Sequence, residues 1–169
     1  MNQIQIHDNF LDTSDFQKIY ENMMGDQFPW YYNTTINTPC LHQSELNYQF
    51  TYSFYVENAG VIGNYYGILL PCLEKMGIRF LLRCKSNLNP KTEVNRQIGD
   101  MHCDYDLRYS KTAIYYVNTN NGFTLFEDGT KVDSVSNRLV VFDTLTNHVG
   151  YTCTDENVRV LINFNYIPV

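Results

Sequence analysis

The sequence has no pair of closely spaced cysteines and no long apolar run. Its five cysteines form no CxxC pair, and an odd number cannot close completely into intramolecular disulfides. No stretch has the length that spans a bilayer. The N-terminus, MNQIQIHDNFLD, has neither a basic n-region nor an apolar h-region. We therefore expect a protein of the reducing cytoplasm that has no membrane partner.

The sequence also has few positively charged residues. The chain has 12 Lys and Arg residues against 18 Asp and Glu residues, and its formal net charge is −6. Such a charge balance repels a polyphosphate backbone, so nucleic acid is disfavoured as a partner. Three cations, Arg79, Arg83 and Lys85, alternate along one short stretch. We interpret them as solvated positions of a strand.

The abundant residues are those of a packed, β-rich domain. Hydrophobic residues make up 44% of the chain, which includes 14 Tyr and 10 Phe. A length of 169 residues suits one domain with a substantial core. Because no internal repeat, low-complexity segment or linker divides the chain, we expect a single domain over residues 1–169.

Residues 1–77 are expected to form a helical framework. Ser14 and Gln17 form an S-x-x-Q capping box before an apolar stripe of helical spacing, and Gly25 ends that helix. A second stripe predicts another helix, which Pro71 kinks or breaks. The expected elements are a strand at 3–10, a helix between Ser14 and Gly25, a strand at 47–56 and a helix at 60–76, while periodicity does not resolve the aromatic segment 28–39.

Residues 78–169 are expected to form strands only, as a jelly-roll core. Period-two alternation marks the strands, and turn signals such as Asn121-Gly122 separate them. Eight short strands favour two sheets that enclose a tapered interior. The predicted fold is mainly β with flanking helices (α+β), a cupin-like double-stranded β-helix with N-terminal helices packed on one sheet. The expected strands lie at 78–87, 100–105, 111–118, 123–127, 131–135, 138–142, 147–151 and 157–166.

Two histidines and an aspartate form a candidate metal site. In His102-x-Asp104, residues two apart on a strand share one face and can reach one ion, while Cys103 points the other way. His148 begins a late strand and supplies a third ligand from elsewhere in the fold. Two imidazoles and one carboxylate are the facial triad of ferrous oxygenases, and they also suit Zn(II) or Mn(II).

One arginine sharpens this hypothesis. The alternation of the last strand places Arg159, Leu161 and Asn163 on one face and apolar residues on the other. An arginine that faces the interior of a barrel requires an anion. Its planar guanidinium binds a carboxylate through two parallel hydrogen bonds, and the distal carboxylate of 2-oxoglutarate would suit it.

The order of these motifs resembles that of the 2-oxoglutarate/Fe(II) oxygenases of the prolyl-hydroxylase type. The resemblance covers residues 79–167 and includes His102-x-Asp104, His148 and Arg159. The strand segments that follow the same order are AIYYVN at 113–118, GFTLF at 122–126 and RLVVFD at 138–143. The N-terminal strand and helix, with FPWYY at 28–32, look like small phage-borne members, which would place the protein in the host cytoplasm.

The resemblance implies a cofactor set and a reaction. His102, Asp104 and His148 would bind Fe(II) as catalytic ligands, 2-oxoglutarate and O₂ would be co-substrates, and ascorbate would be an optional reductant. Arg159 and Tyr116 would hold the far carboxylate of 2-oxoglutarate, and Ile114 shares the face of Tyr116. The reaction would hydroxylate a protein residue, of the prolyl type, or a small molecule, and would form succinate and CO₂.

Two departures from the family pattern concern the co-substrate. Members often have Ser or Thr two residues after the arginine, where this chain has Leu161. The segment 87–100 also lacks the tyrosine that is expected near the other end of 2-oxoglutarate. Candidate residues at the border of the substrate pocket are Arg83, Asn87, Asp106, Arg108 and Trp30.

Three other functions use related residues. A cupin-like metal-binding or structural protein would share the barrel without 2-oxoglutarate turnover, but such a protein does not need an inward arginine at position 159. A zinc hydrolase would use the same ligands. A nucleic-acid demethylase ranks last among the oxygenases because the chain is acidic. Oligomeric state cannot be read from the sequence.

Overall fold

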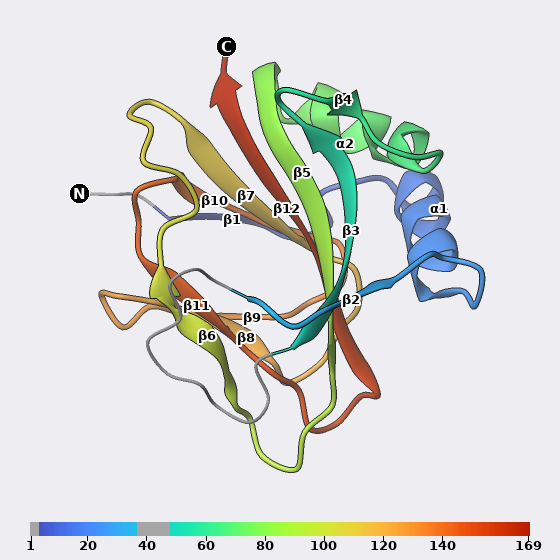
Figure 1. Cartoon of the computed structure of the whole chain (residues 1–169), viewed down its shortest axis with the longest axis vertical. Helices are drawn as coiled ribbons and strands as arrows, with labels where there is room; N and C mark the ends of the chain where they lie inside the picture. Colours follow the sequence, from blue (N-terminus) through green and yellow to red (C-terminus); the bar gives the residue numbers. More distant parts are fainter. Residues whose placement is uncertain (1–3, 37–47) are drawn as a thin grey trace.

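Two antiparallel sheets face each other and enclose the interior of the molecule (Figure 1). The computed structural model describes residues 4–36 and 48–169. The larger, eight-stranded sheet has the order β1 (Gln5–His7), β10 (Arg138–Asp143), β7 (Lys111–Tyr116), β12 (Val158–Pro168), β5 (Ile78–Pro90), β3 (Gln49–Val56) and β2 (Tyr31–Asn33), with β4 (Gly60–Val61) paired to β3. The four-stranded sheet has the order β6 (Gln97–His102), β11 (His148–Tyr151), β8 (Phe123–Phe126) and β9 (Lys131–Asp133).

The long pair β5 and β12 forms the centre of the larger sheet. The two strands pair from Val158 opposite Pro90 to Pro168 opposite Ile78. One face of β12 places Val160 and Ile162 in the core beneath the helices, while the other face points between the sheets. The period-two pattern predicted for this strand is therefore confirmed, and it explains how one strand serves both an apolar core and a polar interior.

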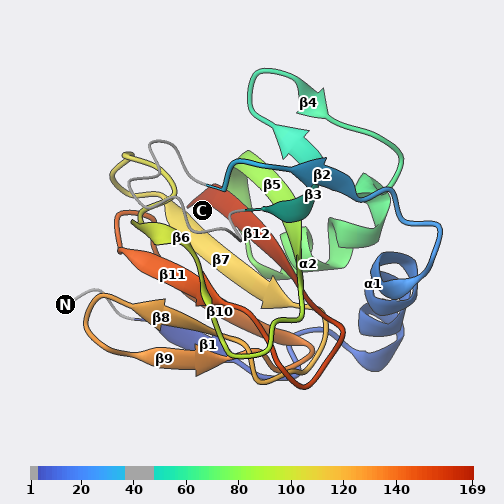
Figure 2. The same ribbon diagram turned by 60° about the horizontal axis from the view of Figure 1, so that its bottom comes forward.

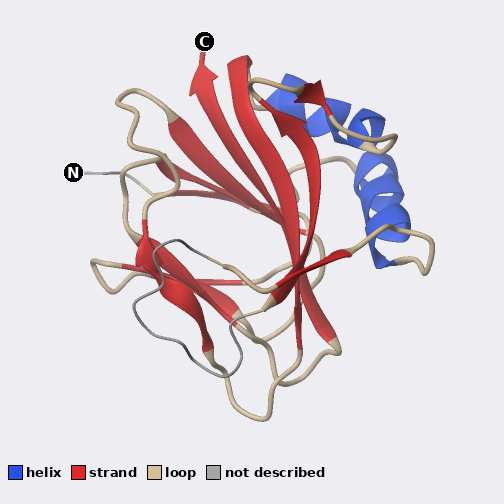
Figure 3. Ribbon diagram, viewed as in Figure 1, coloured by secondary structure: helices blue, strands red, loops and turns tan. Residues whose placement is uncertain are grey.

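The helices cover the outer face of the larger sheet (Figures 2 and 3). They are α1 (Thr13–Met24), the 3₁₀ helix η1 (Tyr66–Leu69) and α2 (Leu70–Lys75). Ile19 and Met23 of α1 are buried with Leu69 and Cys72 in one apolar cluster with the sheet. Packing of the helices on one sheet agrees with the predicted double-stranded β-helix arrangement.

The predicted capping box is wrong. Asp12 is the N-cap of α1, and its carboxylate accepts a hydrogen bond from the Asp15 backbone N–H at 3.0 Å. Because the helix starts at Thr13, Ser14 lies inside it and donates to Asp12, while Gln17 donates to Glu21 one turn later. Gly25 does end the helix, but in an extended conformation rather than the left-handed one.

The single helix predicted over 60–76 is also wrong. The segment contains β4, η1 and α2 in succession. Gly60 and Gly63 have positive φ angles of 75° and 68°, which interrupt any helix there. Pro71 lies in the first turn of α2, where a missing N–H is harmless, so it starts a helix instead of kinking one.

Several strand limits differ from the predicted ones. The first strand is shorter than predicted, β5 extends to Pro90, and β2 lies in the aromatic segment that periodicity did not resolve. The most consequential difference is that β6 ends at His102 instead of continuing through Asp104. Predictions for residues 3, 37–39 and 47 fall outside the described residues.

Two further observations concern the cysteines and the helices. Cys72, Cys84, Cys103 and Cys153 are unpaired, and the fifth cysteine, Cys40, lies outside the described residues. Within the described ranges, every helix is too short or too polar to cross a bilayer.

Candidate metal centre and adjoining pocket

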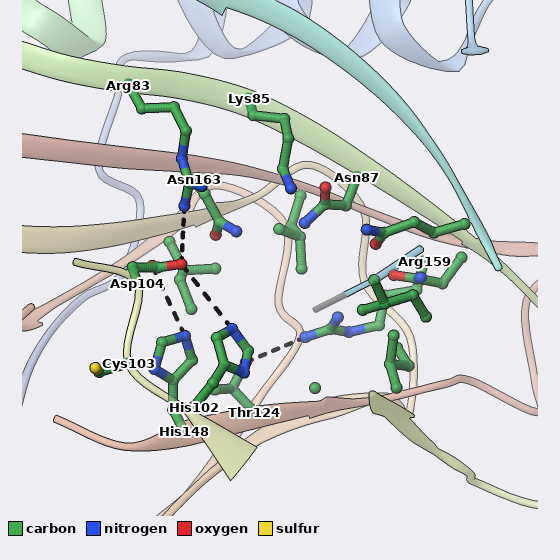
Figure 4. Close-up of a pocket in the computed structure, with 17 residues that line it drawn as sticks. Arg83, Lys85, Asn87, His102, Cys103, Asp104, Thr124, His148, Arg159 and Asn163 are labelled. Atoms are coloured by element: carbon green, nitrogen blue, oxygen red, sulfur yellow. Dashed lines mark hydrogen bonds and ion pairs between the residues drawn. The ribbon is translucent and has the colours of Figure 1, made fainter. Parts of the chain in front are cut away.

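The three predicted metal ligands converge at one point on the smaller sheet (Figure 4). His102 ends β6, and His148 begins β11 directly opposite it in the strand register. One ligand atom from each of His102, Asp104 and His148 lies within 4.8 Å of the other two. The Asp104 carboxylate oxygens lie 4.0 Å from His102 Nε2 and 3.9 Å from His148 Nε2. This arrangement can hold one metal ion.

Asp104 reaches the site in a different way from the predicted one. It lies after the end of β6, in irregular backbone, so strand alternation does not orient it. Cys103 is exposed, and its sulfur points away from the three ligands (Figure 4). The H-x-D spacing therefore brings the two ligands together because the chain turns after His102.

Both imidazoles are oriented by backbone carbonyls. The Asp100 carbonyl lies 2.8 Å from His102 Nδ1, and the Thr146 carbonyl lies 3.1 Å from His148 Nδ1. A carbonyl can only accept, so each Nδ1 carries the proton and each Nε2 keeps a lone pair. The two Nε2 lone pairs are therefore available to a metal. Metal-bound histidines usually donate their other ring N–H to a partner of this kind, which fixes the orientation of the ring.

Two side chains of the larger sheet fix the Asp104 carboxylate. Arg83 Nη2 donates to one oxygen at 2.9 Å, and Asn165 Nδ2 donates to the other at 3.1 Å. Burial alone would raise the pKa of Asp104, but its electrostatic interactions with His148 and Arg83 outweigh that effect and hold the pKa below its ordinary value. Burial lowers the pKa of His148, and the Asp104 carboxylate opposes that effect. An ionised carboxylate and a neutral imidazole are the forms that bind metal.

The chemistry of the donor set fits Fe(II). Two imidazoles and one carboxylate leave further coordination positions open on a six-coordinate ion. The same donors accept Zn(II) or Mn(II), so the ligands select a class of divalent ions and not one element.

Arg159 is buried beside this site without an anionic partner. Its side chain is 1% exposed, and no described carboxylate lies within salt-bridge distance of it. Nε donates to Ser134 Oγ at 2.8 Å and Nη2 donates to Thr124 Oγ1 at 3.2 Å. A buried guanidinium held by two neutral hydroxyls still lacks a countercharge. The site therefore calls for an anion.

Two glycines make room for the arginine. A Cβ atom at Gly122 would lie 2.6 Å from Arg159 Cδ, which is closer than side chains approach each other, and a Cβ at Gly150 would lie 3.4 Å from Nη1. Gly122 and Gly150 lie on the opposite side of the interior from β12, in and next to the smaller sheet. The smaller sheet is thus shaped around the guanidinium.

Of the other two predicted co-substrate residues, Ile114 lines the pocket and Tyr116 lies behind it. Tyr116 is fully buried, and its hydroxyl donates to Thr124 Oγ1 at 2.7 Å. Thr124 thus accepts from both Tyr116 and Arg159, so its own O–H remains as a donor toward the pocket that it lines. Thr124 was not among the residues predicted from the sequence. Thr124 supplies a hydroxyl beside Arg159, which Leu161 does not.

The pocket between the sheets has a cavity volume of about 300 Å³ and a polar wall. Arg83 and Asn87 border it as predicted, but Asp106 and Arg108 are exposed and away from it, and Trp30 packs against the core beneath the helices. The interpretation of Arg83 and Lys85 as solvated strand positions is wrong, because both side chains point into the pocket (Figure 4). Arg79, on the same strand, is exposed.

Three buried amide atoms on this wall have no hydrogen-bond partner among the described residues. They are Asn87 Oδ1, Asn89 Nδ2 and Asn163 Oδ1. All three residues line the pocket. Buried polar atoms are seldom left unpaired in native proteins, so these atoms indicate that the pocket accommodates a polar ligand.

Comparison with known proteins finds similarity in structure only. Neither a protein-family model nor a curated protein sequence matches the chain. An oxidoreductase of the 2OG-Fe(II) oxygenase family from Burkholderia pseudomallei superposes with a TM-score of 0.70 at 15% identity, over 97% of this chain and 84% of that one. A viral collagen prolyl hydroxylase from Paramecium bursaria Chlorella virus-1, in complex with 2OG, gives a TM-score of 0.58 at 13% identity, over 98% and 96%.

A third similar structure performs a different reaction. It is the non-haem α-ketoglutarate-dependent epimerase SnoN from nogalamycin biosynthesis, with a TM-score of 0.65 at 8% identity, over 99% of this chain and 79% of that one. At these identities the similarity establishes the fold. The chain has the double-stranded β-helix of 2-oxoglutarate/Fe(II) oxygenases and prolyl hydroxylases, which confirms the predicted fold class.

Proposed function

We propose that this protein is an Fe(II)- and 2-oxoglutarate-dependent oxygenase. The observation that carries the proposal is the convergence of His102, Asp104 and His148 in the same pocket as the buried Arg159, which has no described carboxylate partner. A metal site alone suits many proteins. A metal site beside a buried cation suits a ligand that has one metal-binding end and one carboxylate end.

Each residue has a distinct task in this proposal. His102, Asp104 and His148 hold the iron, and Arg83 and Asn165 orient the Asp104 carboxylate. When bound, iron, 2-oxoglutarate and O₂ supply an oxidative decarboxylation that yields succinate and CO₂ and oxidises a C–H bond of the substrate.

The co-substrate residues act together at the other end of the pocket. Arg159 donates to the far carboxylate of 2-oxoglutarate, and the free O–H of Thr124 adds a further hydrogen bond. Tyr116 positions Thr124 through its hydroxyl, and Ile114 provides an apolar surface along the carbon chain. Arg159 and Thr124 are both buried, so water has little access to the carboxylate end of the pocket.

The reaction proposed is hydroxylation of a protein residue, of the prolyl type, or of a small molecule. Prolyl hydroxylases are among the proteins of this fold, and an epimerase of the same fold uses the same co-substrate, so the fold alone does not decide the outcome. A cupin-like binding protein is the alternative, and the buried Arg159 without a carboxylate partner disfavours it.

Succinate formation tests the proposal. Protein loaded with Fe(II) is incubated with 2-oxoglutarate, O₂ and ascorbate, and succinate is measured over time. We expect slow, iron-dependent release even without substrate, and none from an Asp104→Ala variant. Absence of succinate at every iron concentration, from protein shown by calorimetry to bind Fe(II), would exclude oxygenase turnover and favour the binding protein.

A further inference from the structure

Lys85 is a third cation in the pocket besides Arg83 and Arg159, and it has no partner among the described residues. Its side chain is largely buried and points from the middle of β5 into the cavity (Figure 4). Within the described ranges it makes neither a hydrogen bond nor an ion pair. In contrast, Arg83, two residues earlier on the same face, is bound to Asp104. Lysines in strands usually extend their charge into water, so this inward orientation requires an explanation.

The strand register places Lys85 among the unpaired amides. Asn163 of β12 lies directly opposite Lys85, and Asn87 is the next residue on the same face of β5. The buried Oδ1 atoms of both amides have no hydrogen-bond partner within residues 4–36 and 48–169. At one end of this wall, Arg83 is hydrogen-bonded to the metal ligand Asp104. At the other end, Asn89 lies opposite Arg159 in the strand register. A cation and two amides without partners are thus grouped between the two sites already described.

Charge balance indicates what this group binds. Given the proposed function, the pocket would hold the cationic metal, Arg83, Arg159 and Lys85 against Asp104 and the two carboxylates of 2-oxoglutarate. Arg159 would take one of those carboxylates and the metal would take the other. Positive charge then remains in excess, and Lys85 carries it without a countercharge. Burial, together with repulsion from Arg83, lowers the pKa of Lys85 to about 8, although Asp104 raises it.

We propose that Lys85, together with Asn87 and Asn163, binds a carboxylate group of the primary substrate. The ammonium group donates to the carboxylate, and the amide groups rotate to donate through their nitrogen atoms, since the two ends of an amide have nearly the same shape. This inference rests on the proposed function and deepens it, because it names the substrate as an organic or amino acid whose carboxylate is anchored beside the metal.

A matched pair of probes tests the anion site. Acetate and acetamide have similar size but differ in charge, and the protein is loaded with Mn(II) and N-oxalylglycine so that the co-substrate position is filled. Thermal unfolding is followed at constant ionic strength. We expect acetate to raise the Tm more than acetamide does, by roughly 3–6 °C at ten times its dissociation constant. The difference is lost in Lys85→Met and kept in Lys91→Met, which alters an exposed lysine just after β5.

A second measurement separates the two sources of a carboxylate. Calorimetric titration of the Mn(II)-loaded protein with 2-oxoglutarate should give dissociation constants that agree within about threefold for the wild type and Lys85→Met. A loss of tenfold or more in Lys85→Met would assign Lys85 to the co-substrate and overturn the proposal. Equal responses of the wild type to acetate and acetamide would overturn it as well.

The two proposals fail in different ways. If the wild type does not bind 2-oxoglutarate but still responds to acetate through Lys85, the anion site stands and the oxygenase proposal falls. If 2-oxoglutarate binds normally and the acetate response survives in Lys85→Met, the oxygenase proposal stands and the anion site falls. Lys85→Met should itself fold, because it removes an unpaired buried charge and keeps an unbranched side chain of similar length.

Discussion

The metal centre and the wall of the same pocket that β5 and β12 form differ in how their polar atoms are partnered. At the metal centre, both imidazoles and the Asp104 carboxylate have hydrogen-bond partners within the protein. On the wall that β5 and β12 form, Lys85 and the amide oxygens of Asn87 and Asn163 have none among the described residues. The first set is organised before any ligand arrives, whereas the second is completed by the ligand. A preorganised metal site thus lies next to a surface whose unpaired polar atoms would select the ligand that binds beside the metal.

Removal of a metal ligand should produce the largest change, a loss of metal affinity at the preorganised centre. Asp104→Ala deletes the only carboxylate of the three ligands and leaves Arg83 unpaired. We expect the affinity for Mn(II) or Fe(II), measured by calorimetry, to fall at least about 100-fold. Asp106→Ala changes an exposed carboxylate in the same segment and should leave affinity unchanged. Equal losses in the two variants would mean that the ion binds elsewhere.

Replacement of Arg159 should separate the metal from the co-substrate. In Arg159→Met, the far carboxylate of 2-oxoglutarate loses a charge-assisted partner, so we expect affinity to fall roughly 100-fold while Mn(II) affinity stays the same. Calorimetry measures both. Arg138→Met serves as the control because Arg138 pairs with Asp8 at the surface. Unchanged 2-oxoglutarate affinity in Arg159→Met would remove the main support for the proposed function.

The unpaired state of Lys85 should be visible as a pH dependence of stability. Its pKa is about 8 in the folded protein and near 10.5 when unfolded, so the unfolded chain binds more protons between these values. The wild type should therefore gain stability relative to Lys85→Met as the pH rises from 8 to 10.5, by on the order of 2 kcal/mol. Urea unfolding of both proteins at several pH values measures this difference. Parallel stability curves would show that Lys85 is solvated.

Loss of the Thr124 hydroxyl should have the smallest effect. Thr124→Val keeps the shape of the side chain but removes the group that accepts from Tyr116 and Arg159. We expect a loss of about 5- to 10-fold in 2-oxoglutarate affinity, because the guanidinium remains but is less well oriented. Thr130→Val, outside the pocket, is the control. A variant with wild-type affinity would exclude Thr124 from the co-substrate site.

Sequence periodicity predicted which residues share a face better than it predicted where elements end. The alternation of the last strand placed Arg159 with Leu161 and Asn163, and the structure confirms this. The same rule extended the strand through Asp104, where the chain has already turned. Alternation depends on local backbone geometry, whereas the end of a strand depends on where its neighbour stops pairing.

The error on Arg83 and Lys85 has a related cause. Alternation separated these two residues from Leu82 and Cys84, but it could not show which face of the strand is exposed to solvent. In this strand the apolar face packs under the helices, and the charged face borders an interior cavity that no local pattern reveals. Thr124 was missed for the same reason, because its role depends on contacts with Tyr116 and Arg159 from two other strands.

The direct pairing of His102 with His148 links metal binding to the behaviour of a sheet edge. Among the described strands, β6 is the outermost of the smaller sheet and pairs with β11 alone. An ion bound by both imidazoles would clamp the last residue of this edge strand to the next strand. Edge strands are where chains fray and where foreign strands add on. Metal loading should thus protect the amides of β6 from hydrogen exchange and make the protein less prone to aggregate.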